Sequence, residues 1–253
     1  MSDKIYLSVV LPSYNEMTNL RKGVLDKIEH FLENQKYSYE IIIVDDGSTD
    51  GSTKFAEEFC KQNKNVRVID NPHLGKAGAV TKGMLEAKGE YRLFTDMDQA
   101  TPIEEVNKLL PFAEKEYSVV IGSRHNQRKG SPITRQIISK IAVLIRKTMV
   151  GITFISDTQC GFKLFKDNAA ESLFKKVSDF HKGFHKIHGS SVTAGFDVEL
   201  LYLANKLGYK IKEVPVDWLY VETRRVNPVT DSIRGLLDFT KIGLNRLTRR
   251  YNI

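Results

Sequence analysis

The sequence predicts an α/β domain with a mostly parallel central sheet that is covered by helices on both faces. Short runs suited to strands alternate with helical patterns, and the connections between them are short. Pairs of aspartates follow two of the runs, at the sheet edge where ligands bind in such folds. With 253 residues, 41% of them hydrophobic and 27% charged, the chain can bury a substantial core.

The first five expected strands are separated by short connections and helical patterns. They are Tyr6–Leu11, Glu40–Val44, Val66–Ile69, Tyr91–Phe94 and Val119–Gly122. Helical patterns extend to about Leu32, over Thr53–Phe59 and from Gly75 to Ala87. This alternation favours parallel pairing of the strands.

The later part of the chain adds helices and a pair of strands. They are a helix at Phe196–Leu207, strands at Ile211–Val214 and Val216–Trp218, and a helix from Asp231. We expect one domain over residues 1–230, with an amphipathic insert at 134–155. A basic amphipathic helix at 231–253 should follow it.

Asp96 and Asp98 stand two residues apart, directly after the strand Tyr91–Phe94. Two carboxylates this close repel each other, and a divalent cation that also bridges substrate phosphates would relieve the repulsion. A solvated turn is the competing interpretation. The second acidic pair, Asp45 and Asp46, should reach the same edge of the sheet, which favours a binding site.

Asp45 and Asp46 follow the strand Glu40–Val44 and precede Gly47, which permits a turn. A carboxylate at this place can accept hydrogen bonds from a nucleobase N–H group or from ribose hydroxyls. The same segment is typical of a turn and a helix N-cap, with a residue of Ser48–Asp50 as the cap. Both roles can hold at once.

Lys76 lies in Gly-Lys-Ala-Gly, at the start of the third expected helix. The spacing of the glycines matches neither a P-loop nor a dinucleotide fingerprint. A lysine that approaches a phosphate at a helix N-terminus and a purely structural turn are equally compatible with the motif.

The chain has a formal charge of +7 and a pI near 9.2, which indicate an anionic partner. Nucleic acid is not favoured, because no binding motif accompanies the charge and the acidic strand tips would repel a phosphate backbone. Cys60 and Cys160 form neither a disulfide framework nor a metal motif. The sequence has no pattern of a signal peptide or of a membrane span, so we expect a cytoplasmic protein with peripheral membrane contacts.

Three motifs in this order resemble those of the inverting family-two glycosyltransferases. They are Pro-Ser-Tyr-Asn-Glu at 12–16, Val-Asp-Asp-Gly-Ser-Thr-Asp at 44–50 and the Asp-x-Asp tip at 96–98. The segments Asp157–Phe165, Phe196–Leu201 and Val216–Trp218 look like those of the dolichyl-phosphate β-glucosyltransferases, and the likeness runs from about Val9 to Leu237. It implies the GT-A fold, a UDP-sugar as donor, and Mg²⁺ or Mn²⁺ as cofactor.

The resemblance also assigns roles to individual residues. The nucleotide is expected on Pro12, Tyr14, Glu16, Asp45 and Asp46, and the metal with the diphosphate on Asp96 and Asp98. Gln99 stands where these glucosyltransferases usually have glycine, so its amide oxygen is a candidate for a further metal ligand and leaves the identity of the sugar open.

Three further charged residues receive roles by the same resemblance. Arg124 would lie near a phosphate of donor or acceptor, with an ordinary surface charge as the alternative. Asp197 is the candidate general base for a hydroxyl acceptor, although an acid is also favourable at a helix start. Arg225 lies in Tyr220–Thr230, which resembles the mobile loop that closes over the donor diphosphate.

The activity implied is transfer of a hexose, most directly glucose from UDP-glucose, to a dolichyl or polyprenyl phosphate at the cytoplasmic face of a membrane. A phosphate monoester has a second pKa near ~6, so its oxygen is already ionised and needs no strong base. The alternatives are mannose transfer from GDP-mannose and glycosylation of a sugar hydroxyl, in which Asp197 would remove a proton. A basic nucleic-acid-binding protein is the non-enzymatic alternative.

Two amphipathic patterns are candidate contacts with an anionic membrane. Thr134–Met149 and Asp231–Tyr251 each set an apolar stripe among lysines and arginines, and packing into the core is the competing interpretation. In the second pattern the stripe comprises Ile233, Leu236, Leu237, Leu244, Leu247 and Tyr251.

His181, His185 and His188 are spaced four and three residues apart. We expect them in a solvated loop rather than at a zinc site, because glycines and serines surround them and no acidic or thiol ligand is near.

Overall fold

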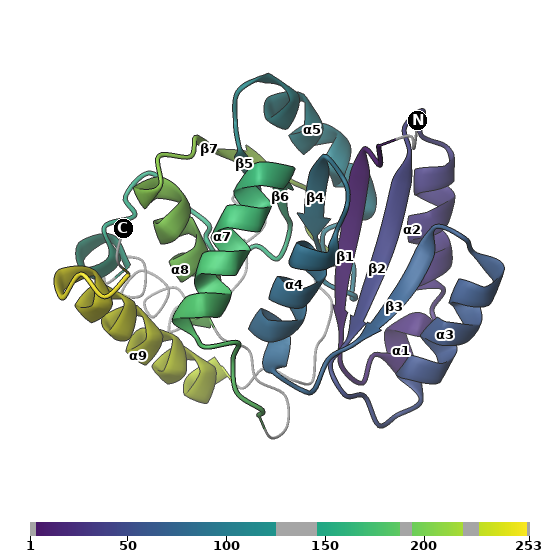
Figure 1. Cartoon of the computed structure of the whole chain (residues 1–253), viewed down its shortest axis with the longest axis horizontal. Helices are drawn as coiled ribbons and strands as arrows, with labels where there is room; N and C mark the ends of the chain where they lie inside the picture. The colour runs from purple at the N-terminus through teal and green to yellow at the C-terminus, as the bar shows by residue number, and fades with distance from the viewer. Residues whose placement is uncertain (1–3, 125–145, 188–193, 220–227, 252–253) are drawn as a thin grey trace.

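Figure 1 shows the computed structural model, which describes residues 4–124, 146–187, 194–219 and 228–251. Within these residues, seven strands form one sheet in the order β3-β2-β1-β4-β6-β5-β7. The strands are β1 (Leu7–Ser13), β2 (Tyr39–Asp45), β3 (Val66–Asp70), β4 (Tyr91–Phe94), β5 (Val119–Ser123), β6 (Lys163–Lys166) and β7 (Ile211–Pro215). Only β6 runs antiparallel to its neighbours, so the expected mostly parallel sheet is confirmed.

Helices cover the sheet on both faces. The described helices are α1 (Met17–Leu20), α2 (Val24–Glu33), α3 (Ser52–Gln62), α4 (Gly75–Glu86), α5 (Val106–Lys115), α7 (Asp167–Phe180), α8 (Ala194–Lys206) and α9 (Pro228–Leu247), with the short turns η1 (Ile103–Glu105) and η2 (Arg146–Val150). Figure 1 shows α4 and α7 in front of the sheet, with α8 and α9 following beyond α7. The fold is therefore a three-layer α/β arrangement.

The central strands are buried on both faces, which explains their continuous apolar sequences. On β1, Val10 packs into the core shared with α4 and α7, whereas Val9 and Leu11 pack into the core shared with α2 and α5. All three side chains are fully buried.

Gly83 lets α4 lie unusually close to the sheet. A Cβ atom there would stand 2.4 Å from Cγ1 of Val10 and 2.8 Å from Cγ2 of Val44. This packing fixes α4 across β1 and β2, so that its first turn reaches the carboxyl edge of the sheet.

The prediction of a strand at Val216–Trp218, after the strand Ile211–Val214, is wrong. β7 ends at Pro215, opposite the last residue of β5, and Val216 N donates to the carbonyl oxygen of Ser123 at 3.1 Å. The chain then turns toward the carboxyl edge, where Leu219 N donates to the carbonyl oxygen of Ala100 at 2.7 Å. β5 ends at Ser123, so among the described residues the β5–β7 ladder does not continue past Pro215.

The C-terminal helix begins at Pro228, three residues before the expected start, and proline is favoured in a first helical turn. Phe239 and Ile242 of α9 are buried in the core shared with α8. Tyr251 is also buried there, so its placement on the same stripe as the exposed Leu244 is wrong. The division of the chain at residues 230 and 231 stays a prediction, and most of the 134–155 insert lies outside the described residues.

Candidate active site at the carboxyl edge of the sheet

The acidic strand tips meet at one edge, as predicted. β2 and β4 are the two parallel neighbours of β1, and Asp45 pairs in register with Ser13 at the end of β1. Asp96 and Asp98 follow β4 directly. Carboxylates from two strands that flank a third therefore share the edge where parallel sheets bind ligands.

Asp45 has one carboxylate oxygen in use and one without a partner. Its Oδ2 accepts hydrogen bonds from the backbone N–H of Ser48 at 3.1 Å and from the Thr53 hydroxyl at 3.0 Å. Its Oδ1 is buried and has no hydrogen-bond partner among the described residues. A buried acceptor of this kind costs free energy unless a ligand donates to it.

Asp46 has a different role, because its carboxylate caps α4. Oδ1 accepts from Leu74 N and Oδ2 from Gly75 N, both at 2.8 Å, and Asn71 Nδ2 donates to Oδ1 at 2.5 Å. α4 has no side-chain cap from its own N-cap residue, Leu74. Asp46 thus supplies the missing acceptors from a distant loop and holds the start of α4 in place.

The other residues expected to hold the nucleotide, Pro12, Tyr14 and Glu16, lie at the end of β1 and directly after it. Pro12 pairs with Val44 in the β1–β2 ladder, and Glu16 accepts a hydrogen bond from Asn19 Nδ2 at 2.6 Å. The ring of Tyr14 stacks on His73, with 4.3 Å between the ring centroids.

His73 is a site residue that the sequence reasoning missed. Its Nδ1 lies 2.7 Å from the carbonyl oxygen of Asp46, and its Nε2 is buried without a partner among the described residues. Its backbone has a positive φ of 54°, which nothing in the local sequence predicts for histidine. Only the tertiary contacts with Asp46 and Tyr14 reveal it.

The residues proposed as metal ligands form a tight turn after β4. Asp98 Oδ1 accepts from Ala100 N at 3.0 Å, and Gln99 Nε2 donates to the carbonyl oxygen of Asp96 at 2.9 Å. Gln99 Oε1 is buried and has no hydrogen-bond partner in the part of the chain that is described. Two carboxylates and an amide oxygen suit Mg²⁺ or Mn²⁺, which prefer oxygen ligands, so these residues fit such an ion.

Lys76 forms an ion pair with Oδ1 of Asp96. The other oxygen, Oδ2, packs against Gly161, where a Cβ atom would stand 2.0 Å from it. Burial disfavours the charged form of Lys76, but the carboxylates of Asp96 and Asp197 outweigh this effect and raise the pKa of the lysine above its ordinary value. Both sides of the Asp96 carboxylate are thus in contact with the protein.

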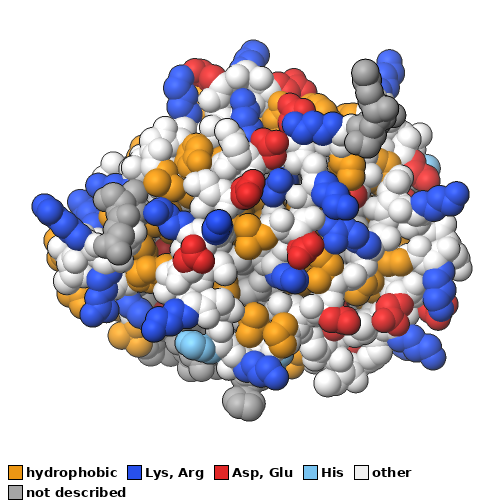
Figure 2. Space-filling view, viewed as in Figure 1, with side chains coloured by type: hydrophobic (Ala, Val, Ile, Leu, Met, Phe, Trp, Pro, Cys, Tyr) orange, Lys and Arg blue, Asp and Glu red, His pale blue; other side chains and the backbone are white. Residues whose placement is uncertain are grey.

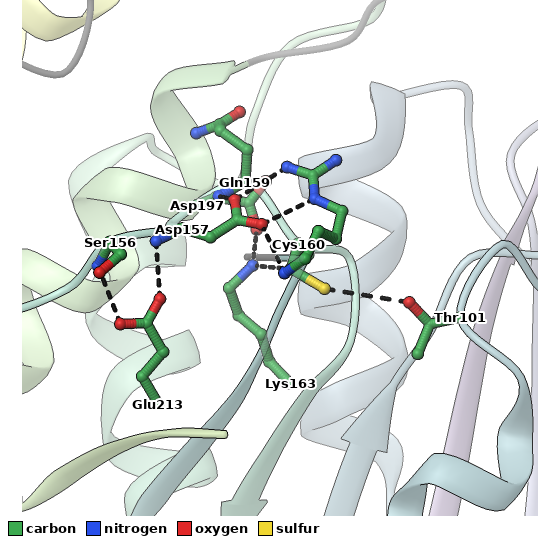
Figure 3. Close-up of polar contacts among 9 residues, drawn as sticks. Thr101, Ser156, Asp157, Gln159, Cys160, Lys163, Asp197 and Glu213 are labelled. Atoms are coloured by element: carbon green, nitrogen blue, oxygen red, sulfur yellow. Dashed lines mark hydrogen bonds and ion pairs between the residues drawn. The ribbon is translucent and has the colours of Figure 1, made fainter. Parts of the chain in front are cut away.

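Asp197 lies in the first turn of α8 and is paired with a buried lysine (Figure 3). Lys163 Nζ lies 2.5 Å from Asp197 Oδ1 and donates to the carbonyl oxygen of Cys160, also at 2.5 Å. The Lys163 ammonium is also 5.3 Å from the centre of the Phe94 ring. The candidate base is therefore the counter-ion of a buried cation, and Lys163 is a second residue that the sequence reasoning missed.

Arg124 is held by Asp157 rather than being an ordinary surface charge. Its Nε and Nη2 donate to the two carboxylate oxygens at 2.7 and 2.8 Å, and its guanidinium lies 5.9 Å from the centre of the Trp218 ring. Burial opposes the charge of Arg124, but Asp157 outweighs it and raises the arginine pKa. Figure 3 shows Glu213 receiving hydrogen bonds from the amides of Ser156 and Asp157, which fix this loop.

The histidine segment differs from the expectation. His181 directly follows α7, and its Nε2 lies 2.5 Å from Oε2 of the buried Glu199, so the prediction that no acid is near is wrong. The Tyr251 hydroxyl donates to the other oxygen of Glu199 at 2.7 Å. The acid, Glu199, lies on α8 rather than near the histidines in the sequence, so the residues around His181 do not reveal it. His188 and Arg225 lie outside the described residues.

Among the described residues, no cluster of three or more histidine, cysteine or acidic side chains could hold a metal by itself. Three side chains of the edge, Asp96, Asp98 and Gln99, nevertheless offer oxygen ligands, and a substrate phosphate would complete the set. The arrangement can thus hold an anionic, phosphate-containing ligand in spite of its acidic residues.

Comparison with known proteins identifies relatives of the chain. The family described as Glycosyl transferase family 2 matches residues 8–178. The chain is 35% identical over 272 residues to the dolichyl-phosphate beta-glucosyltransferase of Saccharomyces cerevisiae, an alignment that spans 98% of this chain and 77% of that protein. It is 32% identical over 263 residues to the human dolichyl-phosphate beta-glucosyltransferase, with 98% and 78% covered.

Solved structures share the fold at low sequence identity. Mannosyl-3-phosphoglycerate synthase from Rubrobacter xylanophilus aligns with a TM-score of 0.65 at 16% identity, over 98% of this chain and 76% of that one. Glucosyl-3-phosphoglycerate synthase from Mycobacterium tuberculosis, solved with Mn²⁺, uridine diphosphate and glucosyl-3-phosphoglycerate, aligns with a TM-score of 0.60 at 16% identity, over 94% and 80%. The expected GT-A-like fold is confirmed.

Proposed function

The chain belongs to glycosyl transferase family 2, and on this basis we propose that it transfers glucose from UDP-glucose to a dolichyl or polyprenyl phosphate, with inversion. The observation that carries the proposal is a pair of buried oxygens without partners among the described residues, Asp45 Oδ1 and Gln99 Oε1. Asp45 is the last residue of β2 and Gln99 lies in the turn after β4, and these two strands flank β1. Asp45 Oδ1 would accept a hydrogen bond from the nucleoside, and Gln99 Oε1 would be a ligand of the metal ion that holds the diphosphate.

Each end of the donor has a candidate partner in this chain. Asp45 Oδ1 would accept a hydrogen bond from the nucleobase or the ribose. Asp96, Asp98 and Gln99 would hold Mg²⁺ or Mn²⁺ with the diphosphate. When bound, the ion neutralises charge that develops on the departing nucleoside diphosphate. Asp46 supports the site indirectly, by fixing the start of α4.

The acceptor chemistry follows from the state of Asp197. A general base would take up a proton and lose its negative charge, whereas the carboxylate of Asp197 neutralises the buried Lys163 through Oδ1. A lipid phosphate supplies an oxygen that is largely ionised at neutral pH and requires no base. The pairing of Asp197 thus supports a phosphate acceptor over a sugar hydroxyl, and direct displacement by that oxygen inverts the anomeric carbon.

A lipid acceptor requires a surface that approaches a membrane, and we assign this role to the outer side of α9. Leu237, Leu244 and Leu247 are 64%, 58% and 75% exposed, although leucine is usually buried. Lys241 and Arg249 are exposed on the same segment. Figure 2 shows Lys and Arg side chains beside hydrophobic ones over the α9 end of the molecule.

Peripheral docking on an anionic, cytoplasmic membrane face agrees with this mixture of leucines and cations. No helix among those the structure describes has the length and apolar character needed to cross a membrane. The other amphipathic pattern, Thr134–Met149, lies mostly outside the described residues, and its contact with a membrane stays a prediction.

The test is a matrix of donors and acceptors with purified protein and Mn²⁺. UDP-glucose, other UDP-sugars and GDP-mannose are each supplied with dolichyl phosphate, with a sugar that offers only hydroxyls, or with no acceptor. We expect lipid-linked product from UDP-glucose and dolichyl phosphate. Product from GDP-mannose would support the mannosyl alternative, and transfer to the hydroxyl acceptor alone would overturn the lipid assignment.

A further inference from the structure

We propose that Lys76 is a built-in counter-ion that occupies Asp96 until the metal and the diphosphate bind together, and then moves to the diphosphate. This inference rests on the proposed function, because it assumes that Asp96 is a metal ligand. It assigns to Lys76 a role in coupling two ligands, rather than only in binding one of them.

The contacts of Asp96 are the first step of the argument. Its Oδ1 is paired with the Lys76 ammonium, and its Oδ2 packs against Gly161 with no room for even one added carbon atom. A cation that approaches Asp96 therefore meets an ammonium on one side and the chain backbone on the other. Lys76 must shift before Asp96 can bind a metal ion with full strength.

The electrostatic interactions also predict that Lys76 opposes metal binding at Asp96. A divalent ion at Asp96 and Asp98 would lie close to the positive charge of Lys76, and like charges at such separations repel strongly where water is partly excluded. The Lys76 side chain is only 27% exposed. In the absence of nucleotide, Lys76 should thus weaken metal binding.

The diphosphate changes this balance. It brings negative charge to the first turn of α4, where Lys76 lies and where a helix start favours anions. α4 is fixed there by the carboxylate of Asp46, so only the flexible lysine side chain has to move. Lys76 then loses one anionic partner and gains another, while Asp96 becomes available to the metal.

The predicted consequence is positive coupling between metal and nucleotide. Because coupling is reciprocal, UDP should tighten Mn²⁺ binding by the same factor by which Mn²⁺ tightens UDP binding. Removal of the Lys76 charge should tighten Mn²⁺ binding to the free protein by about tenfold and reduce the coupling by a similar factor.

The experiment measures free Mn²⁺ by electron paramagnetic resonance during titration of the full chain, with and without UDP. Lys76→Met removes the charge and keeps the length of the side chain, whereas Lys76→Arg keeps the charge and should resemble the parent. Lys82→Met is the matched control, because Lys82 lies on the same helix and, among the described residues, pairs only with the exposed Glu86 at 3.3 Å. It removes one charge without touching Asp96, so its Mn²⁺ affinity should stay within about twofold of the parent's.

Unchanged or weaker Mn²⁺ binding by Lys76→Met in the absence of UDP would overturn the inference, as would equal tightening by Lys82→Met. Should the methionine variant fail to fold, Lys76→Gln repeats the measurement. Asp96→Asn and Asp98→Asn separate the two proposals. If both bind Mn²⁺ as the parent does, the metal site itself is wrong, whereas loss of binding in these variants with no effect of Lys76→Met removes only the role of Lys76.

Discussion

The ammonium of Lys163, which has no exposed surface, lies 2.5 Å from Oδ1 of Asp197 on the first turn of α8. A buried charge is tolerated when it is paired, and each partner here would be costly without the other. The pair joins β6 to α8 next to the acidic edge of the sheet. Asp197 is therefore part of the electrostatic framework of the site.

Lys163→Met and Asp197→Asn should each lower the free energy of unfolding by about 3–5 kcal/mol, because each leaves an unpaired buried charge or acceptor. The double variant should lose less than the sum of the two, as urea unfolding can measure. Lys210→Met, which breaks an exposed ion pair with Glu116, is the control and should change the free energy of unfolding far less, because water screens exposed pairs. Strictly additive losses would mean that the two side chains do not interact.

Asp197→Asn also tests the acceptor. With a lipid phosphate as acceptor, the turnover of the folded variant should fall by far less than the roughly 10²–10⁴-fold expected when a general base is lost. The measurement is the turnover number per folded molecule, with the folded fraction taken from the unfolding curve. A loss in that range per folded molecule would point to a hydroxyl acceptor.

Asp45 and Asp46 are adjacent but should respond differently to substitution. Asp46→Asn removes the charged cap of α4 and should lower the free energy of unfolding by about 1–2 kcal/mol. Asp45→Asn, at the carboxylate with an open oxygen, should weaken UDP binding by about tenfold, the loss of roughly one hydrogen bond. Scanning calorimetry measures the loss of stability, and titration calorimetry measures the loss of UDP affinity. If Asp46→Asn weakened UDP binding and Asp45→Asn lowered stability instead, the roles of the two residues would be exchanged.

Gly161→Ala should reduce activity severely, because the new methyl group would occupy the place of Asp96 Oδ2. Moving a reacting group by about 1 Å can cost about 10²-fold in rate. Gly183→Ala is the control, since no atom of the described residues lies within 4 Å of its added carbon, although its φ of 76° predicts a small loss of stability. Full activity of Gly161→Ala would show that the position of Asp96 is not critical.

Replacing Leu244 and Leu247 with glutamate should reduce flotation with anionic liposomes and turnover with the lipid acceptor, while hydrolysis of the donor by water continues. Each cation near the surface contributes on the order of 1 kcal/mol, so parent binding should also weaken with salt. Leu85→Glu, at an exposed leucine of α4, is the control and should leave flotation unchanged. Normal flotation of the double variant would remove α9 from the membrane contact.

The sequence was sufficient to predict β1, β2 and β4, because these strands are short apolar runs that end in recognisable turns. It also placed Asp45, Asp96 and Asp98 at one edge, since parallel strands bring their carboxyl ends together. The short strand β6 was not predicted, because the antiparallel return of Lys163–Lys166 between β4 and β5 depends on pairing across the sheet.

Roles that depend on distant partners could not be obtained from the sequence. Asp46 caps a helix whose first residue lies 29 positions further on, and a local pattern predicts only caps from the neighbouring residues. Likewise, nothing around Asp197 indicates that Lys163, 34 residues earlier, would neutralise it. The exposed side of α9 was ambiguous because an amphipathic stripe can face a core or a membrane equally well.

The most direct test of the account is the configuration of the product made from UDP-glucose and dolichyl phosphate. The donor carries an α-linked glucose, so a single displacement by the lipid phosphate must give a β-linked glucosyl phosphate. The measurement is the anomeric proton coupling of the purified lipid product by nuclear magnetic resonance. We predict the large coupling of a β-glucoside from the parent protein and no product from Asp98→Asn, whereas an α-linked product, or product formed equally well by Asp98→Asn, would contradict the account.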